Sequence, residues 1–175
     1  MIVVFRCDSS VFLGGGHIMR CLTLANDLQK IGADISFICQ DYPGNLSNLI
    51  VSSGYSLYFL PSDSPFDWSA DAKKVQEILS QNEKPDWIIV DSYDLDARWE
   101  SMMRAYTSKI MVIDDLANRS HDCDLLLDQN YYKGYEKRYD GLLPVGCKKL
   151  LGPEYVLFRQ EFKDARSINL RRGRR

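Results

Sequence analysis

The fold is decided by residues 2–25, which read IVVFRCDSSVFLGGGHIMRCLTLA. The stretch begins with a short apolar run, passes through three consecutive glycines and continues with apolar residues at helical spacing. A short apolar run bounded by turn residues is typical of a buried strand, and apolar residues three and four positions apart are typical of one helix face. Strand, turn and helix in this order form the repeating unit of α/β proteins with a parallel sheet.

The same pattern recurs along the chain. Further apolar runs, each followed by a polar turn, lie at 35–39, 57–60, 87–90, 110–113 and 125–127. Between the strands we predict three helices: one through Leu28 that ends at Gly32, one over 72–79 that begins near Asp67 or Ser69, and one over 95–106 with Asp94 as its N-cap. The alternation predicts an α/β fold with a Rossmann-like, doubly wound parallel sheet.

Length and composition predict one domain. The chain has 175 residues, of which 45% are hydrophobic and 26% are charged, and this suffices for one substantial core. We assign residues 1–157 to a Rossmann-like domain that closes with a turn at 150–155. We assign residues 158–175 to the start of an interdomain helix or linker, helix-like over 158–166, and an arginine-rich tail. Because the chain stops soon after a new element starts, we expect a second domain to be absent.

Charge is distributed unevenly. Four of the last five residues are arginine, whereas the rest of the chain carries 18 basic and 24 acidic side chains. Nucleic-acid-binding proteins usually carry a basic face on the folded part, so we expect no nucleic-acid partner. We interpret the arginine cluster as a solvated end or the remainder of a removed segment, with a polyanion-binding arm as the alternative.

The five cysteines are scattered and form no CxxC pair, which favours reduced thiols in the cytoplasm. The chain begins directly with a strand-like run and lacks a signal-peptide pattern. No apolar stretch approaches the roughly 18 residues that span a bilayer. We therefore expect a cytoplasmic, monomeric protein without membrane contact.

Polar residues end four of the apolar runs, where a parallel sheet collects its ligands. The candidates are Arg6-Cys7-Asp8, Asp91-Ser92-Tyr93, Asp114-Asp115 and Asp128-Gln129-Asn130. In a parallel sheet all four ends face one cleft.

The glycine turn Gly14-Gly15-Gly16 lies beside the same cleft. It matches neither the dinucleotide-binding fingerprint nor the P-loop. A bare backbone and the free N–H groups at a helix start nevertheless favour an anion. His17 would lie in the first helical turn, where the macrodipole disfavours the imidazolium and leaves a neutral ring able to accept a proton. The pattern predicts a phosphate-facing general base, and the alternative is a flexible loop with an ordinary helix-start histidine.

Three other clusters favour structural interpretations. Asp114 and Asp115 suit a cap and a turn better than a metal site, because divalent-ion sites recruit more carboxylates at defined spacing. The run His121-Asp122-Cys123-Asp124 contains zinc-ligand types, but no second cluster completes a site, so packing at the start of a strand is favoured. Tyr131, Tyr132, Tyr135 and Tyr139 suit a sealed surface better than a sugar or base platform. We expect no metal and no cofactor.

Together, the motifs resemble a known family. The segments that carry the resemblance keep their order through nearly the whole chain: Arg6-Cys7-Asp8, Gly14-Gly15-Gly16-His17, Arg20-Cys21-Leu22-Thr23-Leu24-Ala25, Asp91-Ser92-Tyr93, Asp114-Asp115-Leu116-Ala117, His121-Asp122-Cys123-Asp124, Asp128-Gln129-Asn130 and Leu150-Leu151-Gly152-Pro153-Glu154-Tyr155. The family is the UDP-2,4-diacetamido-2,4,6-trideoxy-β-L-altropyranose hydrolases of bacterial pseudaminic acid synthesis. It implies two Rossmann-like domains that face a cleft, as in GT-B glycosyltransferases, with this chain similar to the N-terminal one.

The resemblance also implies a reaction: metal-independent hydrolysis with inversion, in which water attacks the anomeric carbon and UDP leaves. The general-base histidine of the family falls on His17, and its sugar-proximal tyrosine falls on Tyr93. The family motif Asp-His-Tyr reads Asp91-Ser92-Tyr93 here. An inverting hydrolase needs a base for water and stabilisation of the departing phosphate. We expect Asp8 to orient the imidazole or the water, and we expect substrate contacts from Arg6, Asp8, Gly14, Gly15, Gly16, Arg20 and Asp91.

The implied partners are a small-molecule UDP-sugar and a C-terminal domain, in cis or in trans, because the family's second domain supplies most uridine and diphosphate contacts. Two alternatives stay open. The first is the acceptor-side domain of a GT-B glycosyltransferase, and the second is a non-catalytic, truncated sugar-binding module.

Overall fold

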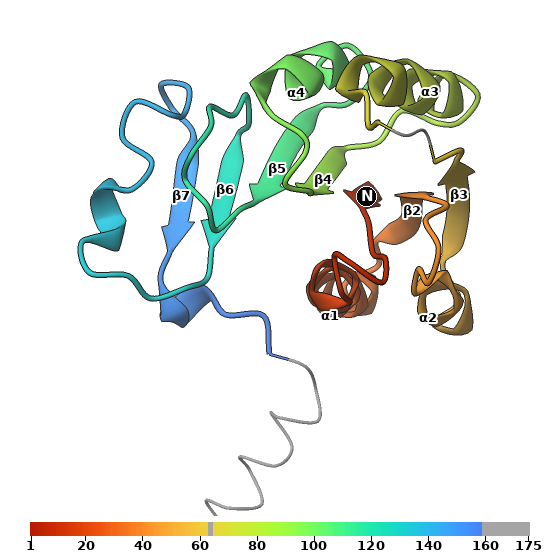
Figure 1. The fold of residues 1–175 in the computed structure, drawn as a ribbon, viewed down its shortest axis with the longest axis horizontal. Coiled ribbons are helices and arrows are strands. Elements are labelled where there is room, and N and C mark those ends of the chain that lie inside the picture. Colours follow the sequence, from red (N-terminus) through yellow and green to blue (C-terminus); the bar gives the residue numbers. More distant parts are fainter. Residues whose placement is uncertain (63–64, 159–175) are drawn as a thin grey trace, which may run out of the picture.

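In the computed structural model, which describes residues 1–62 and 65–158, the chain forms a seven-stranded sheet (Figure 1). Its strands are β1 (Ile2–Cys7), β2 (Asp34–Gln40), β3 (Ser56–Leu60), β4 (Trp87–Asp91), β5 (Lys109–Ile113), β6 (Leu125–Asp128) and β7 (Lys148–Leu151). They lie in the order β3-β2-β1-β4-β5-β6-β7, and all neighbouring pairs are parallel. The predicted Rossmann-like α/β fold and its six predicted strands are confirmed.

Helices cover both faces of the sheet, as Figure 1 shows. On one face lie α1 (Gly16–Lys30) and α2 (Ser47–Ser52), and on the other lie α3 (Trp68–Ser80) and α4 (Ala97–Met103). Short 3₁₀ turns, η1 (Tyr135–Lys137) and η2 (Pro153–Tyr155), flank β7. Each face has its own apolar core. Phe5, Ile18 and Phe37 belong to the core under α1, and Val75 and Trp99 belong to the core under α3 and α4.

The helix boundaries follow local capping. Asp67 caps α3 through the backbone N–H of Ser69, as predicted. The third predicted helix, expected over 95–106, spans Ala97–Met103, and its N-cap is Asp96 and not Asp94. Leu95 is fully buried before the helix begins, and its carbonyl accepts a hydrogen bond from Arg119. These contacts hold the chain in a non-helical connection up to the cap.

Two elements were not predicted. Helix α2 spans six residues and buries only Ile50, so it has no periodic apolar stripe. Strand β7 carries two exposed lysines, Lys148 and Lys149, at the edge of the sheet, and its sequence does not alternate. The predicted turn after it is present as η2. Apart from Phe158, the helix predicted over 158–166 and the arginine tail lie outside the described residues.

Strand alternation decides which polar side chains meet α1. Successive residues of a strand point to opposite faces. In β1, Phe5 and Cys7 pack in the core under α1, whereas Val4 packs in the core under α3. In β4, Ile89 faces α1, so Asp91 two residues later faces it too, and Asp91 pairs in register with Cys7. The end of β4 therefore delivers a carboxylate to the first turns of α1.

Candidate active site

The glycine turn bends the chain from β1 into α1. The backbone N–H of Gly14 donates to the carbonyl of Ser10 at 2.9 Å, and Gly14 has φ +71°, a region that favours glycine. Gly15 is the N-cap of α1 and offers no capping side chain. A Cβ on Gly15 would come within 2.5 Å of the Leu46 side chain. The turn thus places His17 in the first turn of α1, as predicted.

The imidazole of His17 lies against the end of β4. Its Nδ1 is 2.5 Å from Oδ1 of Asp91 and 3.1 Å from Nη2 of Arg20. The residue is buried, with 8% of its surface exposed. In the part of the chain that the structure describes, both polar contacts of the ring fall on Nδ1. With the Nδ1 proton donated to the carboxylate, Nε2 carries the lone pair and is the nitrogen open to a ligand.

Asp91 is the hydrogen-bond acceptor shared by the imidazole of His17 and the guanidinium of Arg20. It is fully buried, and Nε and Nη2 of Arg20 donate to its two oxygens. The thiol of Cys21 lies 3.4 Å from Oδ2. Burial favours a higher pKa for Asp91, but the hydrogen bonds from Arg20 and His17 outweigh it and lower the pKa below its usual value. The ionised carboxylate therefore orients the ring and stabilises it when it becomes protonated.

Tyr93 closes one side of the imidazole. The two rings meet edge to face with centroids 4.6 Å apart. The phenol donates to Oδ1 of Asp115 at 2.8 Å, and burial together with this carboxylate raises the pKa of Tyr93 to about 12. Oδ2 of Asp115 lies 3.5 Å from Nη1 of Arg20. The phenol is therefore neutral at ordinary pH, and Asp115 joins it to the arginine.

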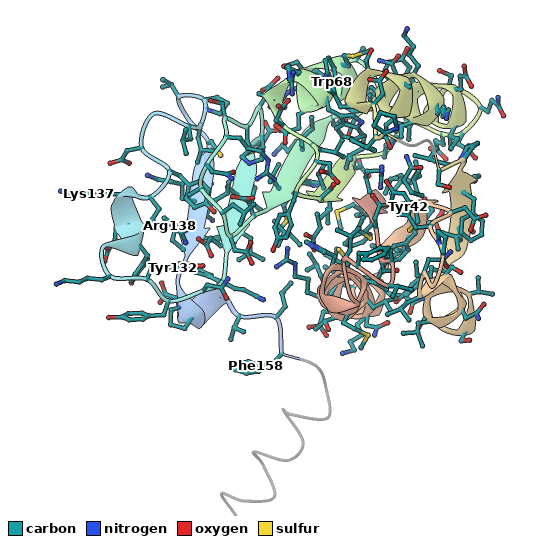
Figure 2. All side chains as sticks on the ribbon, in the orientation of Figure 1. Tyr42, Trp68, Tyr132, Lys137, Arg138 and Phe158 are labelled. Atoms are coloured by element: carbon teal, nitrogen blue, oxygen red, sulfur yellow. The ribbon has the colours of Figure 1, made fainter. Side chains whose placement is uncertain are left out.

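Asp115 was predicted to form a cap or turn, but the structure divides those roles between two residues. Asp114 makes the turn, because its Oδ2 accepts the backbone N–H of Ala117. Asp115 instead faces the site, where the side-chain amide of Asn130 donates to its Oδ2 at 3.2 Å. Arg138 donates to the Asp115 carbonyl and stacks on Tyr132, 3.5 Å from its ring centroid (Figure 2). The segment after β6 thus supports Asp115.

Arg6 points to the face of the sheet that α3 covers, and it pairs there with Asp8 and Asp71, away from the imidazole of His17. Arg6 is fully buried, with Nη2 2.6 Å from Oδ2 of Asp71 and Nη1 2.7 Å from Oδ1 of Asp8. Asp8 also accepts the backbone N–H of Gln40. The expectation that Arg6 holds substrate oxygens needs correction, because its side chain has no exposed surface. The carboxylate on the imidazole is Asp91, not Asp8, because of strand alternation. The roles of His17, Tyr93, Arg20, Asp91 and the glycines toward substrate stay predictions.

The remaining clusters serve packing. The Nδ1 atom of His121 lies 2.7 Å from Glu100 in the interior, and Asp122 and Asp124 both pair with Arg104. The structural interpretation of this run is confirmed. Among the described residues, no group of three or more histidine, cysteine or acidic side chains is placed to hold a metal ion. In the same residues, no helix is both long and apolar enough to cross a membrane.

The tyrosines after β6 differ in burial, although the ring centroids of Tyr131 and Tyr135 lie 6.2 Å apart. Tyr139 is buried and donates to Asp114, whereas Tyr131 is 73% exposed and Tyr132 covers Arg138. The prediction of a common sealed surface is therefore wrong for Tyr131.

The fold and the site define a Rossmann-like α/β domain with a carboxylate–histidine pair beyond the ends of its strands. A solved structure, MurG of Acinetobacter baumannii, is a GT-B neighbour of this fold. The two align with a TM-score of 0.50 and 17% sequence identity over 67% of this chain and 35% of the MurG chain.

The sequence comparison gives a more specific similarity than the structural comparison. The chain is 36% identical over 163 residues to the UDP-2,4-diacetamido-2,4,6-trideoxy-β-L-altropyranose hydrolase of Campylobacter jejuni, which confirms the predicted resemblance. The alignment covers 93% of this chain and 53% of the hydrolase, so the chain spans about half of that relative. An uncharacterized protein, MJ1062 of Methanocaldococcus jannaschii, is 23% identical over 99% of this chain and 34% of its own length. No protein-family model matches the chain.

Proposed function

We propose that this chain is the sugar-facing half of a hydrolase that splits a UDP-linked 2,4-diacetamido-2,4,6-trideoxyhexose into UDP and the free sugar, a step of pseudaminic acid synthesis. One observation carries the proposal: the imidazole of His17 is held at Nδ1 by Asp91, and its Nε2 is left for a ligand. The 36% identity to the Campylobacter hydrolase supports the substrate class.

In the proposed reaction, Nε2 of His17 takes a proton from a water molecule as the water oxygen bonds to the anomeric carbon. The bond from that carbon to the UDP oxygen breaks on the opposite face, so the configuration inverts. The buried carboxylate of Asp91 stabilises the imidazolium that forms. Tyr93 lies beside the ring and contacts the sugar, with its phenol held by Asp115. The protein supplies this chemistry from side chains alone, without a cofactor.

The diphosphate and uridine contacts come from a second domain in this proposal. Ligand sites of this kind form between domains, so half of a cleft binds its ligand weakly and positions it poorly. We therefore expect the 175-residue chain alone to turn over slowly. A C-terminal half of the Campylobacter relative, supplied in trans, should increase turnover.

The test follows UDP release from the UDP-linked trideoxy diacetamido hexose, with the sugar product identified by NMR. Four samples are compared: the chain alone, the chain with the complementing half, and the His17→Ala and His17→Gln variants with that half. We expect slow turnover from the chain alone, faster turnover from the complemented wild-type sample, and none from the two complemented variants, which should retain UDP affinity. Tyr131→Phe is the control, because Tyr131 is exposed and outside the site.

Three results would contradict parts of the proposal. Turnover retained by both His17 variants, with unchanged melting temperatures, would reject the base assignment. A rate equal to that of a complete hydrolase from the chain alone would reject the need for a second domain. Release of UDP only when an alcohol acceptor is added would identify a glycosyltransferase instead.

A further inference from the structure

Two cysteine side chains meet outside the site, on the face of the sheet that α3 and α4 cover. Cys123 precedes β6 and Cys147 precedes β7, and their Sγ atoms are 3.6 Å apart. These strands are adjacent and parallel, with Leu125 opposite Lys148 in register. Cys123 lies two positions before Leu125 and Cys147 one position before Lys148, so the parallel pairing keeps the two cysteines near each other with an offset of one residue. A disulfide needs the sulfur atoms about 2.05 Å apart. A small approach of the two sulfur atoms would therefore allow a bond.

The two thiols differ in access and in acidity. Cys123 is 2% exposed, whereas Cys147 is partly exposed. The hydrogen bond from Cys123 lowers the pKa of Cys147, and the same contact together with burial raises the pKa of Cys123. A partly exposed thiol with a lowered pKa is the nucleophile of such a pair, and the buried thiol is the one that resolves it.

We propose that Cys123 and Cys147 form a reversible redox modification site, in which a peroxide oxidises the two thiols to a disulfide. The Cys147 thiolate attacks one peroxide oxygen, the O–O bond breaks, and a sulfenic acid forms while hydroxide leaves and takes up a proton as water. The Cys123 sulfur then attacks the sulfenic sulfur, an S–S bond forms, and a second water leaves. Overall, two thiols are oxidised and one peroxide is reduced to two waters.

The bond would link the two ends of the segment that supports Asp115. The cysteines are 24 positions apart, and the chain between them carries Asn130 and Arg138. Closing a loop of this size restricts the unfolded chain. The oxidised protein should melt roughly 5–10 °C higher than the reduced protein, from a typical disulfide contribution in a chain of this size. The proposal is independent of the proposed reaction.

Mass spectrometry of the native, fully reduced chain tests the site. The protein is treated with hydrogen peroxide, the remaining thiols are alkylated, and the protein is digested with trypsin. The expected product joins peptides 120–133 and 139–148, and dithiothreitol separates them again. Cys147→Ser and Cys123→Ser should each abolish the linked peptide. Cys39→Ala should retain it, because Cys39 is a buried thiol on the other face of the sheet.

Two outcomes would overturn the proposal. One is Cys147 oxidised to sulfinic acid in the folded protein with no link to Cys123. The other is a first linkage among Cys7, Cys21 and Cys39, which lie together in the interior. A linked peptide without a rise in melting temperature would refute the stabilisation claimed for it.

Discussion

The substitution Asp91→Asn should destabilise the chain strongly, even without substrate. The carboxylate is fully buried and accepts hydrogen bonds from Arg20, His17 and Cys21. An asparagine removes the charge and turns an NH₂ group toward groups that also donate. The guanidinium of Arg20, whose side chain is 13% exposed, then keeps one carboxylate partner, Asp115, at the longer distance of 3.5 Å.

The magnitude follows from that arrangement. Removing one partner of a buried ion pair costs about 3–5 kcal/mol. Because Arg20 keeps a second carboxylate, we expect a loss near the lower end, about 3 kcal/mol in the free energy of unfolding. For a chain of this size the melting temperature should fall by roughly 6–12 °C.

The assay is urea unfolding at several pH values, with Asp34→Asn as the matched control. Asp34 is exposed, and its change should stay within about 0.5 kcal/mol. The pKa of Asp91 is lowered in the folded state, so its stabilisation is fully present above the unfolded value of about 3.9. It is lost as the pH falls through the lower folded value. The difference between wild type and Asp91→Asn should therefore be constant near neutral pH and shrink in acid.

The prediction is wrong if the free energy of unfolding of Asp91→Asn lies within about 1 kcal/mol of the wild-type value. It is also wrong if the difference between the two proteins stays the same in acid. A second readout separates packing from charge. In the wild type, ¹⁵N NMR should report a protonated Nδ1 and an unprotonated Nε2 on neutral His17. In the variant, the side-chain amide can donate to Nδ1, so the proton should move to Nε2.

Further predictions concern a cap, a phenol and a turn. Asp67→Ala removes the side-chain cap of α3 and should cost about 1 kcal/mol in urea unfolding, with an unchanged fold by circular dichroism. In a spectrophotometric titration of the tyrosines, Tyr93→Phe should remove phenolate absorbance only above about pH 11. Burial and Asp115 raise the pKa of Tyr93 to about 12. Gly152→Ala should cost roughly 1–3 kcal/mol in thermal unfolding, because Gly152 has φ +101° and its Cβ would come 3.0 Å from the Tyr135 ring.

The strands could be predicted because buried parallel strands are continuous apolar runs, as in residues 110–113. The edge strand β7 could not be predicted in this way, because Lys148 and Lys149 are exposed and interrupt the apolar run. The start of α4 was misplaced because Asp94 and Asp96 are equally good caps in sequence. Only the burial of Leu95 in the connection decides between them.

In the site, residue types were easier to predict than partnerships. The glycine turn and His17 were located from local sequence, because both depend on the start of one helix. Asp8 was expected beside the ring, whereas Asp91 occupies that position. Counting alternate positions along β1 and β4 would have separated Arg6, on the α3 side, from Asp91, on the α1 side. The roles of Asp114 and Asp115 could not be told apart from the sequence, because only the conformation of the turn decides which way each carboxylate points.

Each of the two arginines that were predicted to contact substrate is paired with two carboxylates. Arg6 lies between Asp8 and Asp71, and Arg20 lies between Asp91 and Asp115. Arg20 brings one positive charge between two carboxylates, so the anionic leaving group of the proposed reaction would be repelled on this side. Added salt would screen that repulsion and would not weaken an attraction. In the proposed reaction, the side of the site at Arg20 would therefore face the uncharged part of the ligand, and the phosphates would lie away from it.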